Sequence, residues 1–267
     1  MPFQQLISRA RMLIDNPQAE FPVQIFHCRE PQSLHRVHFF QPTLMLVLSG
    51  TKRISGPLNR DCPQGNLILV PAGFEFPFAN IPDGFYMALV VVFQPNDFPI
   101  RAIADKTIQL DIQPVDTSLV VLLEQLMQLS HTEVPVEILE SRRKEIAKLL
   151  TELGLDQALR CPASPTWQTK LVNLLQSDIS NEWKLDDVCK TLATSESNLR
   201  RHLQQEGTNF REVLEDLRLT FGLGMIQTTH LPINQIALEC GYQSASRFSE
   251  RFKKRFHTTP SELRQAL

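Results

Sequence analysis

The chain has 267 residues, of which 42% are hydrophobic and 21% are charged, and its formal net charge is −2. This length suits two domains of about 100–200 residues each, and the composition excludes an intrinsically disordered chain. The small net charge excludes a uniformly basic nucleic-acid-binding protein, so any affinity for DNA must come from a local basic patch.

The apolar runs and the cysteines bear on the expected location. No apolar run approaches the roughly 20 residues that a membrane-spanning helix needs. The N-terminal segment MPFQQLISRARMLIDN has mixed charge and lacks the apolar region of a secretory signal, so we expect a cytoplasmic protein with no membrane partner. The cysteines lack Cys-x-x-Cys spacing, which favours buried thiols in a reducing compartment over disulfides or zinc. They are Cys28, Cys62, Cys161, Cys189 and Cys240.

The first half of the chain predicts a short helix followed by a β domain. Residues 3–15 place Leu6, Ala10 and Leu13 on one helical face. Apolar runs of strand length then alternate with proline and glycine, which predicts an antiparallel sandwich or a small barrel. A small barrel either holds one compact ligand or is filled by its own side chains, and both readings stay open. The predicted strands are 23–28, 34–40, 43–50, 66–73 and 85–93.

Few side chains of the β domain suggest a binding site. Lys52 and Arg53 follow the predicted strand 43–50 and would anchor an anionic effector if one binds, but the favoured explanation is a solvated strand end. His35 and His38 are three positions apart in one predicted strand. Since side chains alternate between the two faces of a strand, we expect the imidazoles on opposite faces and no metal site.

Enzymatic chemistry has no support in the sequence. We find no Ser-His-Asp, paired-carboxylate, P-loop or HExxH pattern. The sequence therefore predicts neither an enzyme nor a bound cofactor.

Two helices follow the β domain. Leu119, Leu123 and Leu126 belong to an apolar stripe in 117–129, and a second helix begins after Pro135. The stripe is either domain core or a seam for self-association, and we expect a homodimer formed through the helices in 117–155. The proline-containing stretch 156–165 is the predicted linker between domains.

The segment Ile233–Leu263 predicts a helix-turn-helix. A short helix ends at Gly241, and a second helix from about Ser244 places Phe248, Phe252 and Phe256 on its inner face. Residues 246–267 contain six basic and two acidic side chains, which favours DNA binding through the second helix. These are Arg247, Arg251, Lys253, Lys254, Arg255 and Arg264, with Glu250 and Glu262.

The same pattern occurs twice. Leu185, Val188, Cys189 and Leu192 repeat the spacing of the first helix of Ile233–Leu263. One long helix separates the two units and, if rigid, would hold their second helices for successive major grooves, about 34 Å apart. Gly222 and Gly224 lie in this connecting helix, and each costs about 1 kcal/mol relative to alanine, so we expect the helix to be soft.

The segment from about Thr166 to Leu267 resembles the DNA-binding domain of the AraC/XylS family of bacterial transcription regulators. The resemblance rests on IALECGYQSASRFSERFKKRFHTTPSELR at the end and on the SxxxLRRxLxxEGTxFREVLxxLRL pattern from Ser195 to Leu219. It implies a two-domain α+β fold. Residues 1–155 would form a cupin-like effector-sensing β-barrel with two dimerisation helices, and residues 166–267 two helix-turn-helix units joined by a connecting helix.

The resemblance also implies residue roles. Lys253, Lys254 and Arg255 would contact phosphate, while Glu250 would read a base or pair with a neighbouring cation. His257 stands where a helix-ending glycine is usual, and Arg247 where an aromatic residue is commoner. The residues expected to face the bases are Ser197, Arg200, Arg201, Ser246, Arg247, Ser249 and Glu250.

The expected function is therefore sequence-specific transcriptional regulation, as an activator that binds double-stranded DNA and, by family resemblance, RNA polymerase. In one version the N-terminal domain senses a small effector. In the other it binds a partner protein and no ligand; a pocket with convergent polar groups would favour the first version.

Overall fold

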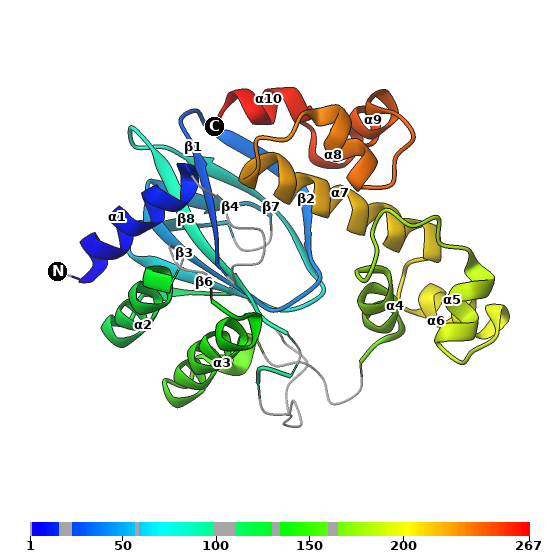
Figure 1. The fold of residues 1–267 in the computed structure, drawn as a ribbon, viewed down its shortest axis with the longest axis horizontal. Helices are drawn as coiled ribbons and strands as arrows, with labels where there is room; N and C mark the ends of the chain where they lie inside the picture. Colours follow the sequence, from blue (N-terminus) through cyan, green and yellow to red (C-terminus); the bar gives the residue numbers. More distant parts are fainter. Residues whose placement is uncertain are drawn as a thin grey trace.

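A β domain and a set of helices at one end of it make up the structure (Figure 1). This computed structural model describes residues 2–15, 23–56, 59–94, 96–98, 110–129, 134–159 and 165–267. The predicted two-domain α+β fold is confirmed. Within the described residues, no helix is long and apolar enough to cross a membrane.

The β domain consists of two facing antiparallel sheets. One has the strand order β1-β8-β3-β6-β9 and the other β2-β7-β4-β5. The predicted barrel is wrong in one respect, because in the described strands no ladder joins the edges of the two sheets and they form an open sandwich. The strands are β1 (Val23–Cys28), β2 (Gln32–Phe39), β3 (Thr43–Ser49), β4 (Thr51–Ile54), β5 (Arg60–Pro63), β6 (Asn66–Val70), β7 (Phe74–Ile81), β8 (Tyr86–Val92) and β9 (Asp111–Pro114).

Continuous apolar strands arise because the five-stranded sheet is covered on both faces. In β3, Leu44 and Leu46 face the N-terminal helices, whereas Met45 and Val47 face the interior of the sandwich. Alternation along the strand thus serves two separate cores. The helices that cover the outer face are α1 (Pro2–Asp15), α2 (Thr117–Gln128) and α3 (Val136–Glu152).

The leucine stripe of α2 belongs to the domain core. Leu119, Leu123 and Leu126 are buried against the sheet. Val121 on α2 and Ile138 on α3 remain exposed, so self-association through these helices stays a prediction. A short 3₁₀ helix, η2 (Asp156–Ala158), follows α3, and residues 160–164 of the predicted linker lie outside the described residues.

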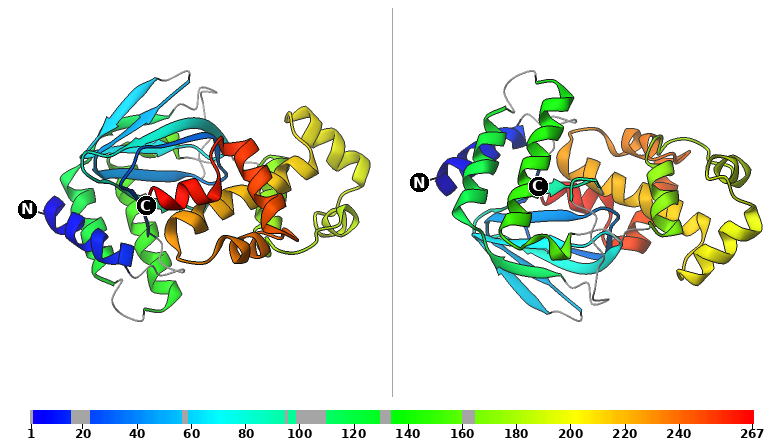
Figure 2. Two further views of the ribbon diagram at one scale, coloured as in Figure 1. Left: turned by 90° about the horizontal axis from the view of Figure 1, so that it is seen from above. Right: turned by 90° about the horizontal axis from the view of Figure 1, so that it is seen from below.

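The helical region contains the two predicted helix-turn-helix units. Figure 2 shows these helices at one end of the sandwich, with α5 and α6 farthest from the N-terminus. The long α7 connects the units, which confirms the duplicated pattern. The helices are α4 (Trp167–Leu175), α5 (Leu185–Thr191), α6 (Glu196–Gln205), α7 (Phe210–Thr228), α8 (Ile233–Glu239), α9 (Ala245–Phe256) and α10 (Pro260–Gln265).

A β-bulge in β2 overturns the expectation for His35 and His38. The register with β7 shifts between Leu34 and Val37, and Arg36 has a φ of 51°. The extra residue reverses the alternation, so both histidines face the helical region. His35 stacks on His257 with ring centroids 4.3 Å apart, and His38 Nδ1 lies 3.9 Å from Asp216 Oδ2 of α7.

Gly222 of the connecting helix has a packing role. A β-carbon at this position would lie 2.8 Å from the ring of Phe248 and 3.0 Å from Cys240 Sγ. A glycine therefore allows α8 and α9 to approach α7 closely. At Gly224, by contrast, an added β-carbon would have no neighbour within 4 Å among the described residues beyond the adjacent backbone of α7. The expected softness of α7 stays a prediction, but packing alone explains Gly222.

Alanine substitutions separate packing from flexibility. Gly222→Ala should lower the free energy of unfolding by roughly 1–3 kcal/mol, because the added methyl group overpacks Phe248. Gly224→Ala is the matched control and should raise it by up to about 1 kcal/mol through helix propensity. Urea denaturation of both variants measures the difference. Stabilisation by both substitutions would contradict the close packing at Gly222.

Candidate nucleic-acid interface

The second helix of the first unit presents a polar face because its apolar face is buried. Leu199 and Leu203 of α6 pack into one core with Val188 and Cys189 of α5. The Ser195 hydroxyl accepts a hydrogen bond of 3.2 Å from the Asn198 N–H and so caps the start of α6. The helix consequently begins directly after the turn, with its outer polar residues exposed.

The second unit is built in the same way. Gly241 ends α8 with a φ of 74°, in the left-handed region that glycine tolerates. The Ser244 hydroxyl then caps α9 by accepting from the Arg247 N–H at 3.3 Å. Phe248, Phe252 and Phe256 are fully buried on one side of α9. The opposite side carries the exposed polar residues.

Arg218 of α7 joins the two units, a role that sequence reasoning missed. Its guanidinium donates to the carbonyl oxygens of Ile179 and Asn181, at 3.1 and 2.8 Å. The same group leaves no room for a side chain at Gly241, where a β-carbon would lie 2.6 Å from Arg218 Nη2. One side chain therefore contacts the loop before α5 and the turn before α9.

Six of the seven residues predicted to read bases are exposed. Arg200 forms an ion pair with Glu196, and Arg201 Nη2 donates to Asn198 Oδ1 at 2.8 Å. Ser249 is the exception and is half-buried. In the described C-terminal region, no ion pair joins Glu250 to Arg247 or to Lys254. The exposed residues are Ser197, Arg200, Arg201, Ser246, Arg247 and Glu250.

The structure contradicts the phosphate contact predicted for Arg255. Lys253 and Lys254 are exposed, but Arg255 is only 7% exposed. Its Nη2 lies 2.6 Å from Glu75 Oε2 of β7 and 3.1 Å from Asp216 Oδ2 of α7. The reason is helical geometry, since position 255 lies beside the buried Phe252 and Phe256 on the face that meets the β domain.

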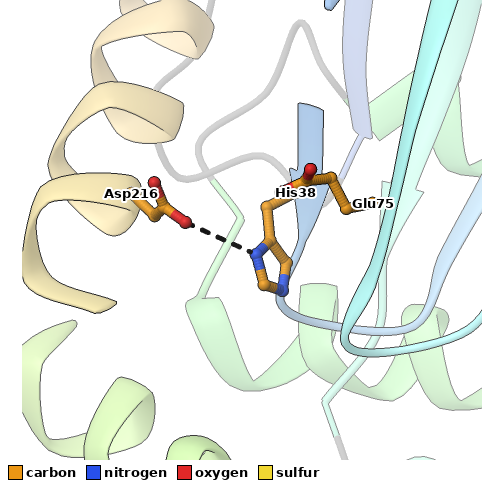
Figure 3. Close-up of side chains that lie close together, drawn as sticks. All are labelled: His38, Glu75 and Asp216. Atoms are coloured by element: carbon orange, nitrogen blue, oxygen red, sulfur yellow. Dashed lines mark ion pairs between the residues drawn. The ribbon is translucent and has the colours of Figure 1, made fainter. Parts of the chain in front are cut away.

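A group of three side chains at this contact has the composition of a metal site. Ligand atoms of His38, Glu75 and Asp216 all lie within 4.8 Å of one another (Figure 3). Arg255 already bonds both carboxylates, and Arg36 Nε donates to Glu75 Oε1 at 3.0 Å. Two guanidinium groups thus neutralise two carboxylates. The cluster is an ion-pair network between the β domain and the helices.

Comparison with known proteins locates the family resemblance in the helices. A helix-turn-helix domain family matches residues 188–266, from α5 to α10. The urease operon transcriptional activator of Escherichia coli is 37% identical over 94 residues, which cover 35% of this chain and 32% of that protein. These matches assign residues 188–266 to a helix-turn-helix domain that this chain shares with transcription regulators.

Two further relatives match this chain over a similar length. The TCP pilus virulence regulatory protein of Vibrio cholerae is 34% identical over 93 residues, covering 35% of this chain and 34% of that protein. The regulator YdeO of Shigella flexneri is 36% identical over 94 residues, covering 35% and 37%. Each match spans about a third of the relative's own length, and all three relatives are named as regulators.

Solved structures extend the likeness to the whole fold. An apo structure of a ToxT variant from Vibrio cholerae superposes with a TM-score of 0.67 at 17% identity, covering 94% of this chain and 98% of that one. ToxT with a bound unsaturated fatty acid gives a TM-score of 0.63 at 18% identity, covering 92% and 95%. At this identity the likeness establishes the fold, including the N-terminal β domain.

The salt dependence of DNA binding distinguishes the exposed lysine from the buried arginine. Each phosphate contact contributes about 0.9 to the slope of log affinity against log salt. Lys254→Ala should therefore reduce the slope by about 0.9. Arg255→Ala should leave the slope unchanged and lower the free energy of unfolding by roughly 1–3 kcal/mol, because it breaks charged hydrogen bonds. Equal slope changes in both variants, measured by fluorescence anisotropy, would contradict the assignment.

Proposed function

We propose that this chain is an effector-responsive transcriptional activator that acts as a homodimer and binds specific DNA sites through α6 and α9. The observation that carries the proposal is the pair of capped recognition helices, each with an exposed polar face, attached to one connecting helix. The name of the urease operon relative supports activation, and an activator requires contact with RNA polymerase or its recruitment.

The exposed side chains of the two recognition helices have the chemistry for reading bases. Arg200, Arg201 and Arg247 can each donate two hydrogen bonds to O6 and N7 of guanine, and Glu250 can accept from N4 of cytosine. The hydrogen bond from Arg201 to Asn198 holds the guanidinium along the helix surface. Ser197, Ser246 and Ser249 complete the proposed reading set, while Lys253 and Lys254 provide affinity without sequence preference.

Substitution of Arg201 tests base reading. Arg201→Ala should weaken binding to a duplex selected by the wild-type protein by about 1–3 kcal/mol and leave binding to random duplex nearly unchanged. Lys254→Ala is the control and should weaken both alike. Fluorescence anisotropy at one fixed salt concentration gives the four affinities. If Arg201→Ala loses affinity equally on both duplexes, Arg201 contacts phosphate instead.

The burial and the partners of Lys52 support the proposal that the effector is an anion. Its side chain points into the sandwich, whereas the guanidinium of Arg53 is exposed and pairs with Asp61 at 2.8 Å. Lys52 Nζ donates to Asn80 Oδ1 at 2.6 Å and lies 3.6 Å from the ring centroid of Phe78. In the described residues no carboxylate pairs with this ammonium. Desolvation by burial lowers the pKa of Lys52 to about 7.

A second donor lies in the same core. The hydroxyl of Tyr86 is buried and has no hydrogen-bond partner in the described structure, and Lys52 Nζ is 5.5 Å from the centroid of its ring. A carboxylate accepts from both groups and supplies the missing counter-charge. ToxT has been solved with an unsaturated fatty acid and with an aryl butenoic acid, and both are carboxylic acids. We therefore propose a carboxylic acid with an apolar tail as the effector.

Calorimetry with oleate tests this assignment. Affinity should fall as the pH rises from 6 to 8, because Lys52 loses its proton in this range. Lys52→Met should bind oleate at least tenfold more weakly, with no pH dependence of this kind. Undiminished binding by the variant would contradict the role of Lys52.

The same variant tests the burial of the ammonium. The folded-state pKa of about 7 lies below the unfolded value near 10.4. Between these values the unfolded chain binds more protons, so stability should rise with pH, by up to about 1.4 kcal/mol per pH unit. Lys52→Met should lack this contribution between pH 7 and 9 in urea denaturation.

A further inference from the structure

A row of buried polar side chains runs from Lys52 to the connecting helix α7. Lys52, Asn80 and Gln32 are direct cross-strand neighbours in β4, β7 and β2, and all three are at most 4% exposed. Asn80 Nδ2 donates to Gln32 Oε1 at 3.3 Å, and Gln227 Nε2 of α7 donates to the same oxygen at 3.4 Å. We call Asn80, Gln32 and Gln227 the amide row.

Lys52 sets the direction of every hydrogen bond in the amide row. An ammonium only donates, so Asn80 must turn its oxygen toward Lys52 and its nitrogen toward Gln32. Gln32 must then present its oxygen to Asn80, and its nitrogen donates to the carbonyl oxygen of Leu263 at 3.4 Å. The carbonyl group only accepts. A donor at one end and an acceptor at the other therefore specify one orientation of each amide.

The far end of the amide row lies in the DNA-binding domain. Gln227 is in the last turns of α7, the helix that joins the two helix-turn-helix units, and Leu263 is in α10. Arg264 of α10 donates to the carbonyl oxygens of Ile226 and Leu231, at 3.0 and 3.2 Å, so α10 and the end of α7 are held together. A change at Gln32 thus acts on both helices.

Burying the polar side chains of the amide row costs free energy of desolvation, which their hydrogen bonds must offset. Gln227 is 7% exposed, and the surrounding core is apolar. Apolar side chains of the same volume usually give equal or greater stability than a buried polar network. Each of the three amides is hydrogen-bonded in one direction, which suits specification of one domain arrangement more than it suits stability.

We propose that the amide row couples the charge at Lys52 to the position of the DNA-binding helices, and hence to DNA affinity. The proposal rests on the effector role of Lys52. A carboxylate bound to Lys52 competes with Asn80 Oδ1 for the ammonium and removes the constraint on the Asn80 amide. The hydrogen bonds of Gln32 to Gln227 and Leu263 then lose their fixed direction, and the contact of β2 with α7 and α10 changes.

A double-mutant cycle on DNA affinity tests the coupling without any effector. Lys52→Met should change the dissociation constant for the selected duplex at least fivefold, in the range typical of allosteric coupling. In a Gln227→Met background the same substitution should change it less than twofold. Asn80→Leu, at the end of the amide row beside Lys52, should abolish the effect as Gln227→Met does, so the result does not depend on one variant. Circular dichroism and thermal unfolding establish that each variant is folded.

The control is Arg60→Met on β5. Arg60 is an exposed cation on the strand beside β4, and the substitution removes the same charge without touching the amide row. It should leave DNA affinity unchanged in both backgrounds. An equal effect of Lys52→Met in both backgrounds, or no effect in either, would overturn the proposed coupling.

Oleate binding separates this proposal from the effector assignment. Gln227→Met should bind oleate as the wild-type protein does, but oleate should no longer alter its DNA affinity. Failure of oleate to bind any variant would refute the assigned effector class, while the mutant cycle would still decide the coupling. Oleate binding together with an additive cycle would refute the coupling alone.

Discussion

The ion pairs of Arg255 are the contact on which the arrangement of the two domains depends. Its guanidinium lies 2.6 Å from Glu75 and 3.1 Å from Asp216, and so joins β7 of the sandwich to α7 and α9 of the DNA-binding domain. A guanidinium that is 7% exposed requires paired carboxylates, because an unpaired buried charge costs several kcal/mol. Movement of α7 and α9 away from the sandwich must therefore break the ion pair of Arg255 with Glu75.

This contact divides the recognition helix into two functional faces. Phe248, Phe252 and Phe256 fix α9 against α7 and α8, and Arg255 fixes its C-terminal end against the sandwich. The polar residues at the start of α9 remain exposed. The proposed reading of bases and the attachment to the sandwich thus use different sides of the same twelve-residue helix.

The N-terminal domain contains a second buried cation, Lys52, whose surroundings differ from those of Arg255. Arg255 has two carboxylate partners, whereas Lys52 has an amide oxygen and aromatic rings. The first arrangement is electrostatically complete, and the second lacks a counter-ion in the described structure. This difference is the physical reason for treating the Arg255 cluster as a structural contact and the surroundings of Lys52 as a place for an anionic ligand. The amide row then links that place to α7.

Local periodicity in the sequence by itself determined the helices, five of the nine described strands and the duplicated helix-turn-helix, because each depends on residues a few positions apart. Short polar strands such as β4 and β5 carry too few apolar residues for such a pattern. Only the tertiary structure decided that Arg255 is buried, since its partner Glu75 is 180 positions away. Likewise, the bulge at Arg36 and the inward direction of Lys52 follow from strand pairing, and Gly222 is explained by the approach of Phe248. These features arise from contacts between segments distant in the chain, whose pairing no local spacing specifies.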